Sequence, residues 1–239
     1  MRLILLLFAC LSMTLPSYAG CVTHISQLPI AQPRIAIAAP TGANLAIGEF
    51  VHVSIPIAGG DRLLLYALHN DAPFTGYSER GILIAHNGRT INKLPLSTLP
   101  ELKGDPKEPD DDPSDSYQSL SLTTMCMGDK AFYWLAFHWQ GDITSAELLV
   151  LLSPRGQQYE FSALPLINGG ILEISRSDPS RFRTWDSLLE GGCNACETHY
   201  EVREYAMVDD KPSFRRKWQT KKLYSSGQFD DQLGVRLVR

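Results

Sequence analysis

Two cysteines separated by two residues form the clearest chemical motif of the chain, Cys193-Asn194-Ala195-Cys196. Such a pair can form a structural disulfide, bind a metal ion or exchange electrons with another dithiol. A redox pair needs its first thiol exposed at the start of a helix, where the helix dipole lowers the thiol pKa. Here the motif follows Gly191-Gly192 and precedes a segment with strand character. We therefore favour a structural disulfide, with thiol–disulfide exchange as the alternative.

Metal and haem chemistry fit this motif less well. Glu197 follows Cys196 where covalent haem attachment requires a histidine. His199 completes a C-x2-C-x2-H arrangement, but no fourth ligand for tetrahedral zinc lies nearby in the sequence. We expect neither a metal nor a cofactor.

Two further cysteines would remain in an exported chain, Cys21 and Cys126. Four cysteines allow three pairings. We favour Cys193 with Cys196 and Cys21 with Cys126, and Cys126 would be a buried thiol if Cys21 were modified instead.

A basic segment with interleaved aromatic residues runs from Lys211 to Tyr224. As a strand it would place Phe214, Arg216 and Trp218 on one face, with Arg215, Lys217 and Lys221 on the other. One interpretation is a patch for an anionic polymer or lipid surface, with Arg215, Lys217, Lys221 and Trp218 as its residues. The interpretation that we favour is a charged edge strand that resists pairing with other sheets.

No catalytic signature is present, since G-x-S-x-G, S-x-x-K and H-E-x-x-H are all missing from the sequence. The six histidines are scattered, and His138 lies in an aromatic run where a core role is the usual one. A triad assembled in space stays open because chain order does not constrain it. His69 and Asp71 flank a loop and are the only faint indication of such a site. We assign no catalytic residues.

The first residues are typical of a secretory signal peptide. A basic Met1-Arg2 precedes an apolar stretch, and Ala19 offers a cleavage point. Tyr18-Ala19-Gly20-Cys21 resembles a bacterial lipobox, but Tyr18 stands where that motif has an aliphatic residue. We therefore expect a periplasmic or secreted bacterial protein, with lipid anchoring through Cys21 as the alternative.

An all-β fold follows from the centre of the chain, where four apolar runs alternate with turn residues. The densest run, Ala131–Trp139, is apolar on both alternating faces and predicts a strand that is buried on both sides. The four runs are 119–127, 131–139, 145–152 and 156–175. We expect antiparallel meanders arranged as a sandwich or a small propeller-like assembly.

The flanking regions complete this domain organisation. A signal peptide over 1–19 precedes an N-terminal β unit over 20–100, in which Asn87-Gly88 marks a hairpin. An acidic, proline-rich linker or loop over 101–117 leads to a C-terminal β domain over 118–239. One short helix is expected near 178–189, because Phe182, Trp185 and Leu188 recur at helical spacing after Pro179.

The leading hypothesis for function is an exported, non-enzymatic binding or structural module stabilised by disulfides. The alternatives are a thiol–disulfide protein using Cys193 and Cys196, and a hydrolase with a loop-assembled site. A net charge of −4 argues against a general nucleic-acid binder. The expected partner is an envelope component or another exported protein, with a membrane involved only if Cys21 is lipidated.

Overall fold

The computed structural model describes residues 22–25, 36–69, 77–99, 117–140, 145–167, 171–188, 196–224 and 235–238. These ranges fold into three β-sheets, and two single 3₁₀ turns, η2 (Ala58–Gly60) and η3 (Leu96–Thr98), are the helical elements among them. The prediction of an all-β fold is therefore confirmed. Within the same ranges, no helix has the length and apolarity needed to cross a membrane.

The N-terminal sheet is a four-stranded antiparallel meander with the order β2-β3-β4-β5. Asn87 and Gly88 join β4 to β5 with φ angles of 48° and 75°, which confirms the predicted hairpin. The strands are β2 (Glu49–Pro56), β3 (Asp61–His69), β4 (Tyr77–His86) and β5 (Arg89–Pro95).

The middle sheet has the order β1-β6-β7-β8-β9. Its central strand β7 is buried on both faces, as its sequence predicted. Tyr133, Leu135 and Phe137 enter the core on one side, whereas Phe132 and Trp134 enter the core on the other. The strands are β1 (Thr23–Ile25), β6 (Tyr117–Met127), β7 (Lys130–Gln140), β8 (Ser145–Arg155) and β9 (Gln158–Ile167).

The C-terminal sheet has the order β13-β12-β11-β10-β14. Four of its strands form an antiparallel meander, and β14 joins β10 in parallel. The strands are β10 (Ile171–Ser175), β11 (Arg181–Ser187), β12 (Tyr200–Val208), β13 (Lys211–Gln219) and β14 (Val235–Val238).

The helix predicted near 178–189 is wrong, because residues 181–187 form strand β11. This strand pairs with β10 on one side and with β12 on the other. Phe182 and Thr184 are buried at a spacing of two residues, whereas Trp185 lies on the opposite face. Pairing on both edges satisfies the backbone of β11, and this tertiary context overrides the helical spacing of its apolar residues.

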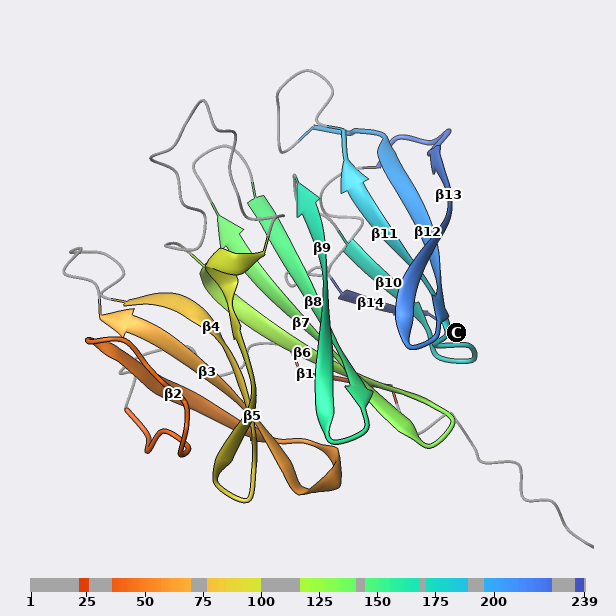
Figure 1. Cartoon of the computed structure of the whole chain (residues 1–239). Coiled ribbons are helices and arrows are strands. Elements are labelled where there is room, and N and C mark those ends of the chain that lie inside the picture. Colours follow the sequence, from red (N-terminus) through yellow and green to blue (C-terminus); the bar gives the residue numbers. More distant parts are fainter. Residues whose placement is uncertain are drawn as a thin grey trace, which may run out of the picture.

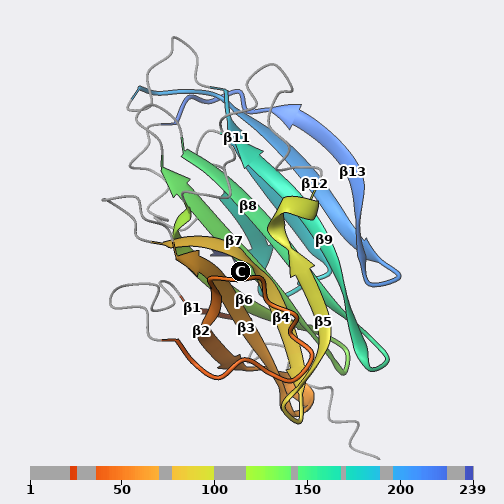
Figure 2. The same ribbon diagram turned by 60° about the vertical axis from the view of Figure 1, so that its left-hand side comes forward.

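The three sheets stack as layers with the middle sheet between the other two (Figures 1 and 2). One apolar core joins the N-terminal and middle sheets and includes Leu65, Ile82 and Leu135. A second core joins the middle and C-terminal sheets, where Trp134 meets Phe182 edge to face at 5.2 Å. The first core draws on residues from both sides of the predicted 101–117 linker, which lies outside the described residues except for Tyr117.

Asn92 of β5 ties the edges of the N-terminal and middle sheets together. Its side-chain amide donates to the carbonyl oxygen of Tyr159 on β9 at 3.0 Å and accepts from the Tyr159 backbone N–H at 2.7 Å. Tyr159 also donates from its hydroxyl to Asp61 at 3.1 Å. Burial and the nearby Asp61 carboxylate raise the pKa of Tyr159.

Candidate functional site

Two of the four predicted disulfide cysteines lie within the described residues. Cys126 on β6 and Cys196 are each disulfide-bonded. Cys21 and Cys193 lie outside the described residues. The pairing of the four cysteines stays a prediction.

The four residues of the predicted anionic-ligand patch do not lie on one face. Trp218 pairs with Val202, whereas Lys217 pairs with Arg203 and so points to the other side of the sheet. Lys221 follows the end of β13, and Arg215 lies at a break in the pairing of β12 with β13.

This break corrects the predicted alternation of β13. Glu204 pairs with Arg216 but Tyr205 pairs with Phe214, so that Arg215 is an extra residue in the strand. Phe214 therefore lies on the face that packs toward the middle sheet, where its ring contacts Tyr205 at 5.9 Å. Arg216 and Trp218 stay together on the outer face.

The outer face of the C-terminal sheet carries a row of alternating charges that crosses all five strands. Register places one residue of each strand at this level. In spatial order from β14 to β13, the members are Arg236, Glu173, Arg183, Glu204 and Arg216. We call these five residues the charged row.

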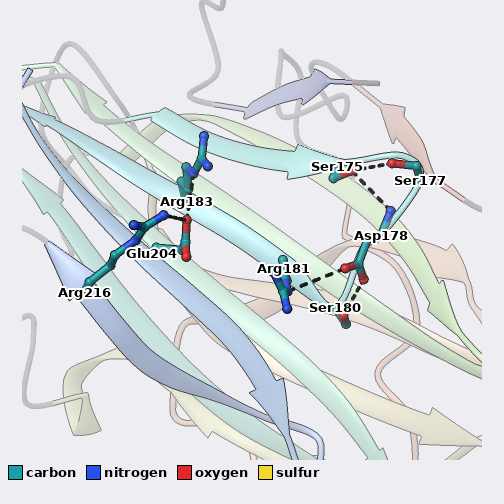
Figure 3. A network of polar contacts seen from close by, with 8 residues as sticks. All are labelled: Ser175, Ser177, Asp178, Ser180, Arg181, Arg183, Glu204 and Arg216. Carbon is teal, nitrogen blue, oxygen red and sulfur yellow. Dashed lines mark hydrogen bonds and ion pairs between the residues drawn. The ribbon is translucent and has the colours of Figure 1, made fainter.

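Glu204 is the centre of the contacts in the charged row. Its Oε2 accepts hydrogen bonds from Nε of Arg183 and Nη2 of Arg216, both at 3.2 Å (Figure 3). These hydrogen bonds, that from Arg216 first, lower the pKa of the Glu204 carboxyl below its ordinary value. Arg183 also donates from Nη1 to Glu173 at 3.4 Å. Two carboxylates thus fix the orientation of the Arg183 guanidinium.

Trp218 lies beside the charged row and contacts both guanidinium groups. The Cζ atoms of Arg216 and Arg183 lie 5.0 Å and 5.6 Å from the centre of its ring. This cation–π geometry holds the two cations over an aromatic surface.

The cations of the charged row stand further into solvent than its carboxylates. The Arg216 and Arg183 side chains are 65% and 40% exposed, whereas those of Glu204 and Glu173 are 18% and 13% exposed. A ligand that approaches this face therefore meets guanidinium groups first.

A hollow of about 500 Å³ opens over the row and reaches the turn between β10 and β11. Asp178 of this turn accepts a hydrogen bond from Ser180, and Arg181 lies 3.7 Å from its carboxylate (Figure 3). The Arg181 side chain is 74% exposed. The lining residues are Glu173, Ser175, Asp178, Arg181, Phe182, Arg183, Glu204, Arg216 and Val238.

On the opposite face of the same strands, Lys217 is engaged by an acidic neighbour. It donates to Glu201 at 3.1 Å, and Arg203 donates to the same carboxylate at 2.8 Å. Both partners, Lys217 first, lower the pKa of Glu201. Lys217 is therefore part of a separate ion-pair cluster.

Sequence reasoning missed most of the charged row. Arg183 was assigned to a helix, and Glu173 and Arg236 lie far from the basic segment in sequence. The alternation of Arg181 and Arg183 with the apolar Phe182 was the available signal for β11. Nothing local could show that these strands are neighbours.

Two of the described histidines each lie beside one carboxylate. Nε2 of His52 lies 2.9 Å from Glu79, and both side chains are buried. Nδ1 of His86 lies 2.6 Å from Asp61. The His138 side chain, the His69 side chain and Asp71 fall outside the described set. Among described residues, no group of three histidine, cysteine or acidic side chains is placed to hold a metal ion.

Comparisons with family models, curated proteins and solved structures give no match to this chain.

Proposed function

We propose that the protein is an exported, non-enzymatic binding module that holds an anionic ligand on the outer face of its C-terminal sheet. The binding groups are the guanidinium groups of Arg183 and Arg216, with Arg181 beside them. Trp218 and the carboxylates of Glu173 and Glu204 position these groups.

The greater exposure of the arginines than of the carboxylates between them is the observation that supports this proposal most. Each guanidinium has five N–H donors in a planar fork. Glu204 and Glu173 engage only part of this set. The remaining donors suit the oxygen pairs of carboxylates and phosphates, which guanidinium groups bind in a bidentate manner.

Preorganisation adds to the expected affinity. Arg183 contacts Glu173, Glu204 and Trp218 before any ligand arrives. A side chain that is already ordered loses less conformational entropy when it binds.

Export and the disulfides belong to the same proposal. The signal-like segment 1–19 and the disulfide-bonded state of Cys126 and Cys196 agree with an oxidising compartment. We propose the pairs Cys193–Cys196 and Cys21–Cys126. The mass of the mature protein, alkylated before and after reduction, tests the number of disulfides and the alternative of a lipid on Cys21, and the masses of unreduced proteolytic peptides test the pairing.

The proposed site is tested by titrating the purified protein with poly-L-glutamate and with inorganic polyphosphate, followed by calorimetry. We expect binding of at least one probe, weakened about tenfold or more in Arg216→Gln. A charge-assisted hydrogen bond is worth about 1.5–3 kcal/mol, and the lower end of this range corresponds to about a tenfold change in affinity. Lys221→Gln is the matched control, because it removes an exposed charge near the same strand but outside the charged row.

Two results would overturn the assignment. Binding that falls equally in Lys221→Gln and Arg216→Gln would indicate general charge attraction and not a defined site. No binding of either probe at low salt would exclude an anionic-ligand surface on this face.

A further inference from the structure

Two guanidinium groups of the charged row converge on a single oxygen atom. Nε of Arg183 and Nη2 of Arg216 each lie 3.2 Å from Oε2 of Glu204, so the two nitrogen atoms are no further apart than twice this distance (Figure 3). The two Cζ atoms also lie 5.6 Å and 5.0 Å from the centre of the same Trp218 ring. One small anionic group can therefore reach both cations.

Both arginines keep hydrogen-bond donors for such a group. A guanidinium group has five N–H bonds. Toward the described residues of the charged row, Arg183 uses Nε and Nη1, and Arg216 uses Nη2. The side chains of both arginines are also more exposed than the carboxylates that they contact. The unused donors are thus accessible from solvent.

The convergence favours an anionic group that serves two guanidinium groups at once. A carboxylate has two oxygen atoms, and a single guanidinium group can engage both of them in a bidentate pair. A phosphate monoester has three acceptor oxygen atoms and a charge of about −1.5 to −2 at pH 7. It can therefore accept hydrogen bonds from Arg183 and Arg216 together.

The hollow beside these arginines has room for more than the anionic group. Its volume of about 500 Å³ lies within the range of about 300–1,000 Å³ that is usual for small-molecule sites. Phe182 and Val238 add apolar groups to its lining, and Ser175 adds a hydroxyl group. The body of a small organic molecule can therefore occupy the hollow next to the arginines.

We propose that the ligand is a small phosphorylated molecule. Its phosphate monoester is bound by Arg183 and Arg216 together, and the rest of the molecule lies in the hollow. This inference rests on the proposed function, because it names the ligand class of that same site.

The first test compares phenyl phosphate, phenyl sulfate and benzoate, which carry the same ring and differ in the anionic group. Affinity is measured by calorimetry at pH 8, where the phosphate monoester is a dianion. We expect phenyl phosphate to bind at least about tenfold more tightly than benzoate, with phenyl sulfate between them. Inorganic phosphate should bind more weakly than phenyl phosphate, and equal affinity would overturn the organic ligand in favour of free phosphate.

The second test uses the charge of the phosphate. Its second pKa is about 6, so about a tenth of the ester is dianionic at pH 5. We therefore expect the affinity for phenyl phosphate to fall about tenfold from pH 8 to pH 5, and that for phenyl sulfate to stay within about twofold. No histidine is among the described residues that line the hollow, and the charged residues there are Glu173, Asp178, Arg181, Arg183, Glu204 and Arg216. An equal fall for both probes would mean that the protein titrates, and would overturn recognition of a dianion.

The third test asks whether one phosphate contacts both arginines. Arg183→Gln and Arg216→Gln should each weaken phenyl phosphate binding about tenfold, whereas the double variant should lose clearly less than the hundredfold or so that independent contacts would give. Arg215→Gln is the matched control, because it removes an exposed arginine next to Arg216 that does not line the hollow. It should change the affinity by less than about twofold. The comparison of probes on the unaltered protein gives an answer even if a variant fails to fold.

The outcomes separate this inference from the function on which it rests. Benzoate that binds as tightly as phenyl phosphate, or losses that multiply fully in the double variant, would overturn the shared phosphate. Arg216-dependent binding of poly-L-glutamate or polyphosphate would then still support an anion site. Loss of Arg216-dependent binding for every probe would overturn both.

Discussion

The two outer faces of the stack differ in what covers them, although each belongs to a sheet that contains a four-stranded antiparallel meander. The outer face of the N-terminal sheet is apolar and packs under residues 43–45, with Val51, Leu64 and Tyr66 in a small core. The corresponding face of the C-terminal sheet bears the charged row and the hollow above it. The meander of the N-terminal sheet thus buries its outer face in a small core, whereas the meander of the C-terminal sheet exposes the charged row.

The segment that covers the outer face of the N-terminal sheet is hydrogen-bonded to both edges of that sheet. Ile37 donates to the carbonyl of Val51 on β2 at 2.8 Å, and Thr41 donates to the carbonyl of Gly88 beside β5 at 2.9 Å. Lys93 donates to the carbonyl of Asn44 at 2.7 Å and lies over the ring of Tyr66. The covered face is therefore expected to contribute to stability, and the open face to binding.

The largest expected effect is at Gly81, beneath the covered face. A Cβ at this position would lie 2.3 Å from the carbonyl oxygen of Leu94 and 2.5 Å from the hydroxyl of Tyr66. Gly81→Ala should lower the free energy of unfolding by about 3 kcal/mol, because neither the backbone of β5 nor the buried ring can move freely. Urea denaturation measures the change, and an unchanged midpoint would mean that the two strands separate easily.

Leu64→Ala should lower the free energy of unfolding by about 2.5 kcal/mol, since it opens a cavity under the covering segment. Leu64 is 4% exposed, whereas Leu188 at the end of β11 is 41% exposed. Leu188→Ala is therefore the control, with an expected change of less than about 0.5 kcal/mol. If both variants lose the same stability in urea, the segment does not protect a core.

Arg183→Gln should cost less than about 1 kcal/mol of stability, because its ion pairs are partly exposed and screened by water. The same change should weaken poly-L-glutamate binding about tenfold. Thermal unfolding and calorimetry on one preparation measure both effects. A large loss of stability with intact binding would make the charged row a structural feature.

The smallest effect expected is on the acid stability of the C-terminal sheet. The folded pKa values of Glu201 and Glu204 are lowered, so their contribution is complete above the ordinary carboxyl pKa of about 4.3 and is lost as pH falls through the lowered values. Urea midpoints should therefore fall less with acidification in Arg216→Gln than in the unaltered protein. A parallel pH profile for the two proteins would contradict a role for Arg216 in lowering the Glu204 pKa.

Local pattern predicted the strands well and their partners poorly. The double apolar face of Ala131–Trp139 correctly predicted a strand in the middle of a stack. Phe182, Trp185 and Leu188 misled the prediction, because a spacing of three residues occurs in strands whose two faces are both partly apolar. The extra residue at Arg215 has no sequence signal, since a bulge depends on the partner strand.

The candidate site was less predictable than the fold. Its charges come from positions 173, 183, 204, 216 and 236, and only sheet order and register bring them to one level. The sequence correctly indicated a basic strand in this region, and the role of Trp218 in ligand binding stays a prediction. It could not reveal the acidic partners, because only the pairing of neighbouring strands brings Glu173 and Glu204 beside Arg183.

The pairing of Asn92 with the backbone of Tyr159 also bears on how the protein behaves at high concentration. A strand at the edge of a sheet can recruit strands from other molecules and so start aggregation. The amide of Asn92 occupies both backbone groups of Tyr159 on the edge strand β9, as a neighbouring strand would. The Asn92 side chain thereby blocks the backbone groups to which a strand of a second molecule would bind at this position. We expect this contact to reduce aggregation of the folded protein.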